Sequence, residues 1–325
     1  MLLYCIAIIS MSLLCVLSSA TSNLTDATAP NNTTTEAYTV TFIAVQYQPP
    51  YVQTVTVDTD SLAVTVDMAP QLLQPHYRQH AGMVTVRSRM YSIGAHDSPS
   101  FKGVEMYDNG RWTIQKSTND YRYMAVVGYQ PHTGQLFACG CEYSGACSHT
   151  CEFRSETSDG TWTTQHLSNG ECIIQGAGVV YNNKVWISGG WDCSGRPSTR
   201  LMSFDGSNWT KHTPMRHTRL RHAMAVDGDT LVVCGGFSRY FLSSCESYVP
   251  AIDVWLDMPS MPQALGYISL FPLGAGRLVM FGGENGSYYK HVDVFDRIKW
   301  FTAPGSNAAL NNLDNPFGAT ALPAN

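Results

Sequence analysis

Short apolar runs separated by polar turns recur along most of the chain. A representative stretch reads HAMAV (222–226), then Asp227-Gly228-Asp229, then TLVVC (230–234). Four- to five-residue apolar runs bounded by Gly, Asp and Asn are typical of β-strands joined by hairpin turns. No amphipathic helical pattern of useful length follows residue 20. The pattern therefore predicts an all-β protein.

The apolar runs belong to a repeat. A glycine ends the second strand of each unit, and a tryptophan preceded by an aromatic residue marks the last two strands. Three markers that keep one period over five copies predict an array of units of about 47 residues, each with four strands. The glycines are Gly94, Gly140, Gly189, Gly235 and Gly282; the tryptophans are Trp112, Trp162, Trp209, Trp255 and Trp300; the aromatic residues are Tyr107, Phe153, Phe204, Tyr248 and Phe295.

These markers resemble kelch repeats, in which a glycine doublet closes the second strand of each unit. The resemblance implies that each unit forms one four-stranded blade of a β-propeller. Glycine suits such a turn because it accepts a positive φ and a close backbone approach. The first two copies depart from the doublet, with Gly94-Ala95 and Gly140-Cys141.

The two ends of the array resemble two parts of one further unit. Residues 38–70 read as the second, third and fourth strands, and residues 315–325 read as a lone first strand. A ring that closes abolishes the exposed edges of its sheets. We therefore expect residues 38–325 to form a six-bladed kelch β-propeller closed by a C-terminal strand, with repeats at about 75–115, 120–165, 173–213, 219–259 and 263–302.

The N-terminal residues predict secretion. Residues 1–20 carry no charge, are apolar from Leu2 to Leu17 and end in small residues, which is typical of a cleaved signal peptide. The alternative is an uncleaved membrane anchor, and we expect no other membrane span. Residues 21–37 form a leader rich in Ser, Thr and Asn. N-glycosylation sequons occur at Asn23, Asn31, Asn32, Asn208 and Asn285.

Eight of the ten cysteines follow the signal segment, and an even number in a secreted chain favours disulfides over metal. Buried free thiols are the alternative. Placement on neighbouring strands of one blade predicts the bonds Cys139–Cys151 and Cys234–Cys245, and loop positions add Cys141–Cys147 and Cys172–Cys193. The rival set joins Cys139 to Cys147 and Cys141 to Cys151. Cys139 and Cys234 also read as small buried core residues.

The resemblance places the loops between second and third strands, and those between blades, on one face. Arginine beside aromatic side chains is the composition of interface hot spots, and guanidinium groups suit carboxylates. We expect this face to bind an anionic ligand, either an acidic peptide or a sialylated glycan. The alternative is that the arginines hydrogen-bond neighbouring loops. The candidate binding residues are Arg78, Arg122, Arg219, Arg221, Trp191, Tyr240 and Tyr288.

No motif of an enzyme active site appears: the chain lacks a GxSxG elbow, an HExxH helix and a phosphate-binding glycine loop. We expect no catalytic residue, no cofactor and no metal, and a monomeric binding module for a protein or glycan. The alternative is a sugar-modifying enzyme resembling a sialic acid epimerase. The net charge of −5 argues against nucleic acid as a partner.

Overall fold

The computed structural model describes residues 51–69, 81–94, 102–141, 149–157, 160–167 and 171–306, together with four strands near the two ends of the chain. Those strands are β1 (Ala7–Ile8), β2 (Leu14–Leu17), β3 (Thr39–Gln46) and β26 (Thr320–Ala321). The described residues form strands and turns without α-helix, so they contain no helix that could span a membrane. The all-β class is confirmed.

Five antiparallel blades follow one another along the chain, and in each the strands pair in sequence order. Blade 1 holds β6 (Gly82–Val86), β7 (Arg89–Ile93), β8 (Val104–Asp108) and β9 (Arg111–Gln115). Blade 2 holds β10 (Val126–Gln130), β11 (Gln135–Cys139), β12 (Thr150–Ser155) and β13 (Thr163–His166). Blade 3 holds β14 (Ala177–Tyr181), β15 (Lys184–Ser188), β16 (Leu201–Phe204) and β17 (Trp209–Lys211). Blade 4 holds β18 (Ala223–Asp227), β19 (Thr230–Cys234), β20 (Cys245–Val249) and β21 (Val254–Met258), and blade 5 holds β22 (Ser269–Gly274), β23 (Arg277–Phe281), β24 (Val292–Phe295) and β25 (Trp300–Thr302).

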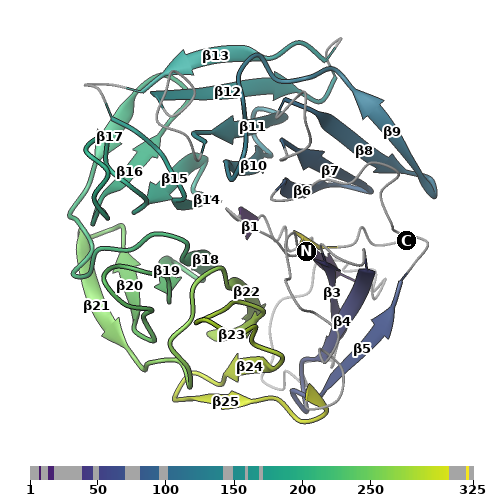
Figure 1. Cartoon of the computed structure of the whole chain (residues 1–325), viewed down its shortest axis with the longest axis vertical. Coiled ribbons are helices and arrows are strands. Elements are labelled where there is room, and N and C mark those ends of the chain that lie inside the picture. Colours follow the sequence, from purple (N-terminus) through teal and green to yellow (C-terminus); the bar gives the residue numbers. More distant parts are fainter. Residues whose placement is uncertain are drawn as a thin grey trace, which may run out of the picture.

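The blades stand in a ring with their first strands innermost (Figure 1). β3, β4 (Tyr51–Asp58) and β5 (Val64–Met68) occupy the sector between blades 5 and 1. Their sheet has the order β2-β26-β3-β4-β5, so it joins strands from both ends of the chain. β1 adds to the inner edge of blade 3 by pairing with β14.

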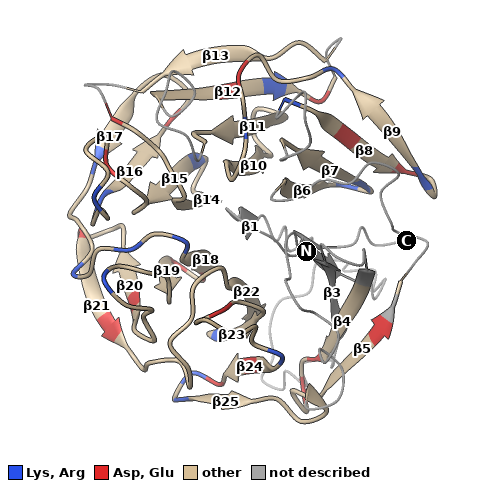
Figure 2. Ribbon diagram, viewed as in Figure 1, with Lys and Arg blue, Asp and Glu red and all other residues tan. Residues whose placement is uncertain are grey.

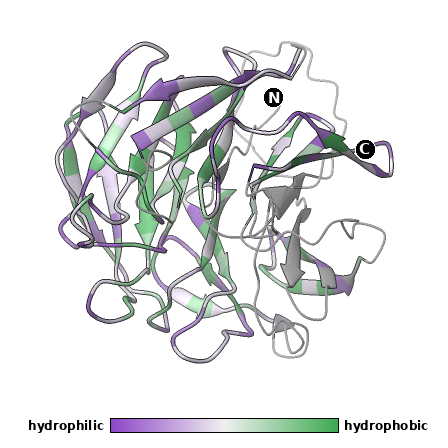
Figure 3. Cartoon of the chain, turned by 45° about the horizontal axis from the view of Figure 1, so that its top comes forward, coloured by the Kyte–Doolittle hydropathy of each residue, from purple (hydrophilic) through white to green (hydrophobic). Residues whose placement is uncertain are grey.

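The core lies between neighbouring blades, because each blade buries apolar side chains on both faces. One cluster joins Val179 and Trp186 of blade 3 to Leu231, Val233 and Tyr248 of blade 4. The inner strands of the blades are accordingly the most hydrophobic part of the chain, whereas many turns, loops and outer strands carry polar residues (Figure 3). Burial on two faces explains why the inner strands read as continuous apolar runs rather than as alternating ones.

The marker glycines close the gap between consecutive blades. Each has a positive φ, and a Cβ on Gly189 would lie 2.4 Å from the carbonyl oxygen of Arg219, which belongs to the next blade. The backbone N–H of the next residue, Gly190, donates a hydrogen bond to this same carbonyl oxygen of Arg219 at 2.7 Å. Cys141 N–H makes the equivalent bond to Ile173, so the turn survives in the copy without a doublet.

Within the described residues, the tryptophan marker of blades 2, 4 and 5 also connects its blade to the preceding one. The indole N–H of Trp255 donates to the carbonyl of Thr213, at the exit of blade 3, over 2.8 Å. Trp162 and Trp300 reach the preceding blade in the same way. Trp209 differs, because its indole nitrogen is buried and has no partner among the described residues.

Blade 2 also departs from the aromatic marker. In the other four blades an aromatic residue of the third strand lies opposite the tryptophan, as Tyr248 does with Trp255. In blade 2 the register pairs Phe153 with Thr163, one position away. Arg154 therefore takes the place level with Trp162, and Phe153 packs toward Phe204 of blade 3 with ring centres 5.2 Å apart.

Three of the expected disulfides are present. Cys139–Cys151 and Cys234–Cys245 join directly opposed residues of the second and third strands, with Cα atoms 4.0 and 4.2 Å apart. Cys172–Cys193 joins the segment before blade 3 to a loop within it. The bond between Cys139 and Cys151 contradicts the rival set. Cys141 is disulfide-bonded as well, and its expected partner Cys147 lies outside the described residues.

Candidate binding face

Four blades carry a left-handed residue at one equivalent position, two residues before the first strand. These residues have φ values from 53° to 57° although none is glycine. A left-handed backbone costs an ordinary residue about 1–2 kcal/mol, and such strain is concentrated at functional sites. The residues are Met124 in blade 2, Gln175 in blade 3, Arg221 in blade 4 and Tyr267 in blade 5. We call them the mouth residues, because each one leads into the innermost strand of its blade.

The mouth residues contact one another across blades. Gln175 donates its side-chain amide to the sulfur of Met124 at 3.4 Å and accepts a bond from Arg221 Nε at 2.8 Å. Arg221 lies over the ring of Tyr267, with Cζ 4.4 Å from the ring centre. Tyr267 in turn packs against Tyr123 and Met124, so blades 2 and 5 meet here. The mouth residues thus form a continuous belt over four blades.

Arg221 is the charged member of this belt. Its Nε is bonded to Gln175 and its plane is held by Tyr267, whereas its two terminal amino groups make no hydrogen bond and no ion pair with any described residue. The side chain is partly exposed. A basic segment leads into β18 at this point (Figure 2). A guanidinium fixed through Nε and stacked on a ring presents its remaining N–H groups to a carboxylate in a fixed orientation.

Trp191 joins the same network from the β15–β16 loop. Its backbone N–H bonds to Ile174, and its indole N–H donates to Gln175 Oε1 at 3.2 Å. Gln175 Oε1 therefore holds both Trp191 and Arg221. The corresponding loops of blades 4 and 5 carry Tyr240, which is 78% exposed, and Tyr288, which is 37% exposed. The structure thus brings Arg221 and Trp191 together and leaves the two tyrosines accessible.

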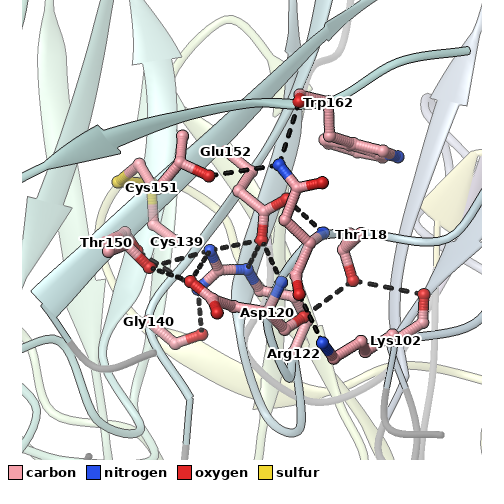
Figure 4. Close-up of polar contacts among 12 residues, drawn as sticks. Lys102, Thr118, Asp120, Arg122, Cys139, Gly140, Thr150, Cys151, Glu152 and Trp162 are labelled. Atoms are coloured by element: carbon pink, nitrogen blue, oxygen red, sulfur yellow. Dashed lines mark hydrogen bonds and ion pairs between the residues drawn. A yellow bond between two sulfur atoms is a disulfide. The ribbon is translucent and has the colours of Figure 1, made fainter. Parts of the chain in front are cut away.

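Arg122 has a different position from the one we expected. Its side chain is fully buried and makes an ion pair with the buried Glu152 at 2.6 Å (Figure 4). The guanidinium also donates to the carbonyls of Gly140 and Thr150 and to the hydroxyl of Thr150. Burial lowers the pKa of Arg122, while the charge of Glu152 acts in the opposite direction.

Arg219 repeats this arrangement in blade 4. Its buried guanidinium pairs with Glu246 at 2.8 Å and donates to the carbonyls of Gly235 and Ser244. The expectation that Arg122 and Arg219 contact a ligand is therefore corrected: with no exposed surface, each links the turn after its second strand to its third strand. Arg78 lies outside the described residues.

His222 is also buried, close to the charged side chain of Arg219. Its Nε2 lies 2.8 Å from the hydroxyl of Ser188 in blade 3. Burial, together with the charge of Arg219, lowers the pKa of His222 to about 3. The imidazole is therefore neutral at physiological pH and serves packing between blades rather than ligand binding.

Sequence reasoning missed Met124, Gln175 and Tyr267. Four unrelated side chains occupy the mouth position, so the residue type does not identify the position in the sequence. The available signal is position alone: each residue lies two places before the first strand, at intervals of 51, 46 and 46 residues. Only Arg221 combines that position with a side chain that suggests binding.

Comparisons with known proteins agree with the repeat pattern. Residues 218–262, which include blade 4, match the family model described as the Kelch motif. Together with the blades described above, this match supports a kelch-repeat β-propeller family for the chain. Kelch-like protein 36 of Bos taurus is 29% identical over 136 residues, which are 38% of this chain and 22% of the relative. Beta-scruin of Limulus polyphemus is 33% identical over 96 residues, which are 26% of this chain and 10% of the relative.

The fold comparison covers more of this kelch propeller. A solved structure titled "Structure of YjhT" superposes with a TM-score of 0.63 and covers 80% of this chain and 95% of the other, at 13% identity. That likeness shows the fold alone. The matched regions span about a fifth or less of the curated relatives reported above.

Proposed function

We propose that this kelch propeller is a secreted or cell-surface binding module that holds an anionic protein or glycan ligand at the mouth residues. The observation that carries the proposal is the guanidinium of Arg221, which is oriented by Gln175 and Tyr267 and has no carboxylate partner among the described residues. Positive charge that is fixed but uncompensated favours an anionic group, and a carboxylate matches its planar geometry.

The surroundings of Arg221 support a ligand larger than a single anion. Trp191, Tyr240 and Tyr288 belong to the loops of three consecutive blades, and aromatic side chains of this kind provide contact area at a low entropic cost. An acidic peptide or a sialylated glycan would place its carboxylate on Arg221 and its remaining surface on these rings. Arg122 and Arg219 would contribute only by holding the loops.

The test measures binding of the purified chain to an array of acidic peptides and to a glycan array with sialylated members. We expect binding on one array, and Arg221→Ala to weaken it at least about tenfold, because a hydrogen bond to a charged group contributes about 1.5–3 kcal/mol. The melting temperature should change little. Arg297→Ala, at an exposed arginine in the β24–β25 turn of the opposite face, is the matched control. Full affinity in Arg221→Ala would contradict the proposal.

Closure of the ring into six blades is part of the proposal. It is supported by the pairing of β26 with β3 at Ala321 and Phe42. The sheet of β3–β5 also bonds to the end of blade 5, since Val64 N–H donates to Pro304 at 2.8 Å. Removal of all residues after Gly305 should therefore expose an edge strand and lower the melting temperature sharply. A truncated chain as stable as the full chain would contradict closure.

Secretion is supported by the disulfides, which are consistent with an oxidising compartment. Asn208 and Asn285 are both exposed, so both sequons are accessible to glycosylation. Cleavage near residue 21 would remove β1 and β2, which pair with β14 and with β3 and β26, so this proposal requires those sheets to persist without them. Expression in a secretory cell line followed by mass spectrometry tests this part: we expect an N-terminus near residue 21 and glycan on Asn208. Full occupancy of Asn285 would place a glycan next to Tyr288 and restrict ligand contacts to the other blades.

The enzymatic alternative requires a carboxyl group with a raised pKa beside an arginine of the mouth. Among the described residues, burial raises the pKa of Asp227 and of Asp293. Asp293 is bonded to Tyr289 and Thr302, and Asp227 is the last residue of β18, beside the turn on the opposite face. No observation in the described part of the chain favours a sugar-modifying enzyme over a binding module.

A further inference from the structure

A groove lies between blades 4 and 5, on the face opposite the mouth residues, where the β18–β19 and β22–β23 turns border it. Its cavity volume is about 340 Å³, within the range of about 300–1,000 Å³ that is usual for small-molecule pockets. Most of its lining is apolar, so the groove can receive an apolar group. The residues from the strands that line it are Val232, Ser247 and Met258 of blade 4 and Phe295 of blade 5.

Blade 4 lacks an aromatic ring that three other blades place against the next blade. Two residues before the end of the second strand, blades 1, 2 and 3 bury an aromatic side chain, namely Tyr91, Phe137 and Trp186. Each of these rings packs in a cluster with residues of the following blade. Blade 4 has the smaller Val232 at the same position. The groove therefore occupies space that a ring fills at the equivalent junctions of the other blades.

The third strand of blade 4 leaves out a second ring. At the junction of blades 2 and 3, Phe153 lies opposite Phe137 and packs on Phe204, with ring centres 5.2 Å apart. Ser247 occupies the place of Phe153 in blade 4, and Phe295 occupies the place of Phe204 in blade 5. Aromatic rings pack favourably with their centres about 4.5–7 Å apart. An aromatic group of a ligand therefore matches the space beside Phe295.

Two side chains of opposite charge border the groove. Asp227 is half-buried at the end of β18, and its carboxylate accepts the backbone N–H of Gly276 in blade 5. Burial raises the pKa of Asp227, and no cationic side chain among the described residues lowers it. Arg297, in the β24–β25 turn, is exposed and also lines the groove. A Cβ on Gly276 would lie 3.9 Å from Asp227 Oδ2 and 3.1 Å from Arg297 Cγ, so both side chains lie beside Gly276.

We propose that this groove binds a free α-amino acid with an aromatic side chain. The ammonium group bonds to the carboxylate of Asp227, the carboxylate bonds to the guanidinium of Arg297, and the ring packs beside Phe295. An α-amino acid carries an ammonium, a carboxylate and a ring close to one carbon atom, which matches two opposite charges next to an apolar groove. Its ammonium also compensates the partly buried charge of Asp227, which is unfavourable without a partner. The site lies on the other face from the mouth residues and is independent of their ligand.

The test is a calorimetric titration of the purified full chain with L-phenylalanine. Three further probes each lack one group: phenethylamine lacks the carboxylate, 3-phenylpropionate lacks the ammonium group, and L-alanine lacks the ring. We expect L-phenylalanine to bind with a stoichiometry of about one, and each of the other probes to bind at least about tenfold more weakly, since each loses a charge-assisted hydrogen bond or the apolar contact. No binding of L-phenylalanine at millimolar concentration, or equal affinity for all four probes, would overturn the proposal.

Variants test the charges and the space separately. Asp227→Asn and Arg297→Gln should each weaken binding of L-phenylalanine at least about tenfold, whereas Asp229→Asn, which removes an exposed carboxylate of the same turn, should leave it unchanged. Ser247→Phe gives blade 4 the ring that blade 2 carries, so it should abolish binding without lowering the melting temperature. Full affinity in Ser247→Phe, or an equal loss in Asp227→Asn and Asp229→Asn, would contradict the proposed site. None of these outcomes depends on the ligand of the mouth residues.

Discussion

Blades 2 and 4 differ from blades 3 and 5 at the same structural position. Four residues before the first strand, blades 2 and 4 carry the buried Arg122 and Arg219, whereas blades 3 and 5 carry Ile173 and Leu265. The third strands follow the same division. They hold Glu152 and Glu246 in the first pair of blades, against Met202 and Asp293 in the second pair, at places that the strand register makes equivalent.

The disulfides are divided in the same way. The opposed cysteines of blades 2 and 4 correspond to Ser188 and Leu201 in blade 3 and to Phe281 and Val292 in blade 5. Only blades 2 and 4 therefore combine a charged pair with a covalent bond across the second and third strands. All four blades nevertheless use the backbone carbonyl of the residue four places before the first strand as the contact for the preceding glycine turn.

The comparison shows that every one of these blades uses the backbone carbonyl of this residue to contact the preceding blade. The side chain at the same position differs between blades, so no particular residue type is required there. A charged pair in that position must be complete, because a buried arginine without its carboxylate is costly, whereas an apolar pair of similar volume is often equally stable. Arg122 and Arg219 are thus structural even though their sequence context resembles that of Arg221. The following variants test this view, from the largest expected effect to the smallest.

Glu246→Gln should be the most damaging change in blade 4. It leaves the buried charge of Arg219 without a carboxylate, and breaking a buried pair in this way costs about 3–5 kcal/mol. Arg219→Ile combined with Glu246→Met copies blade 3 and should restore most of that free energy of unfolding. Urea unfolding of both variants measures the difference. Equal losses in the single and double variants would show that the charge pair itself is required.

Trp255→Ala should cost about 3–5 kcal/mol, because the ring is buried and its removal leaves a large cavity. Trp209→Ala should cost less, since Trp209 is only partly buried and its indole nitrogen makes no bond among the described residues. The two variants compare blade 4 with blade 3 at one repeat position. Thermal unfolding of both is the measurement, and an equal effect would contradict the difference in their roles.

Replacement of Cys234 by Ala and Cys245 by Val should lower the free energy of unfolding by about 3 kcal/mol, as the loop-entropy model predicts for a ring of this size. Blade 3 folds without such a bond, so the variant should remain folded with an unchanged circular dichroism spectrum. Unfolding in urea without reductant gives the change. A loss of the fold would show that blade 4 depends on its disulfide more than the comparison implies.

Acidification should weaken the contact between blades 3 and 4 through His222. Its pKa in the folded chain is about 3, below the ordinary value of 6.5, so between these pH values the unfolded chain binds more protons. The stability contributed by neutral His222 is complete above about pH 6.5 and is lost as the pH falls toward 3. We expect His222→Gln to reduce the slope of stability against pH by up to about 1.4 kcal/mol per unit between pH 6 and 4. An identical slope in wild type and variant would contradict this assignment.

Much of the architecture could be predicted from spacing alone. The five blades and their strand order follow from markers that repeat every 47 residues or so, because each blade must present the same turn and the same tryptophan ring to its neighbours. The three observed disulfides were predicted from the places of their cysteines on strands and loops. The one-residue shift of Phe153 was not predictable, since two adjacent aromatic-compatible positions look alike until the register is known. Candidate binding residues were harder still, because of the two arginines in RLR (219–221) one is buried in an ion pair and the other is partly exposed.

The amino-acid sequence by itself determined the period of the chain, the places of its glycines and the placement of cysteines on neighbouring strands, since these depend on local backbone geometry and on neighbours in the same blade. Only the tertiary structure decided which arginine is available. Arg219 meets the glutamate of its own third strand and is buried, whereas Arg221, turned by a left-handed backbone, lies against Gln175 and Tyr267 of the adjacent blades. The direction of each side chain and its contacts with neighbouring blades decide whether the arginine is buried or exposed. Neither can be read from the amino-acid sequence alone.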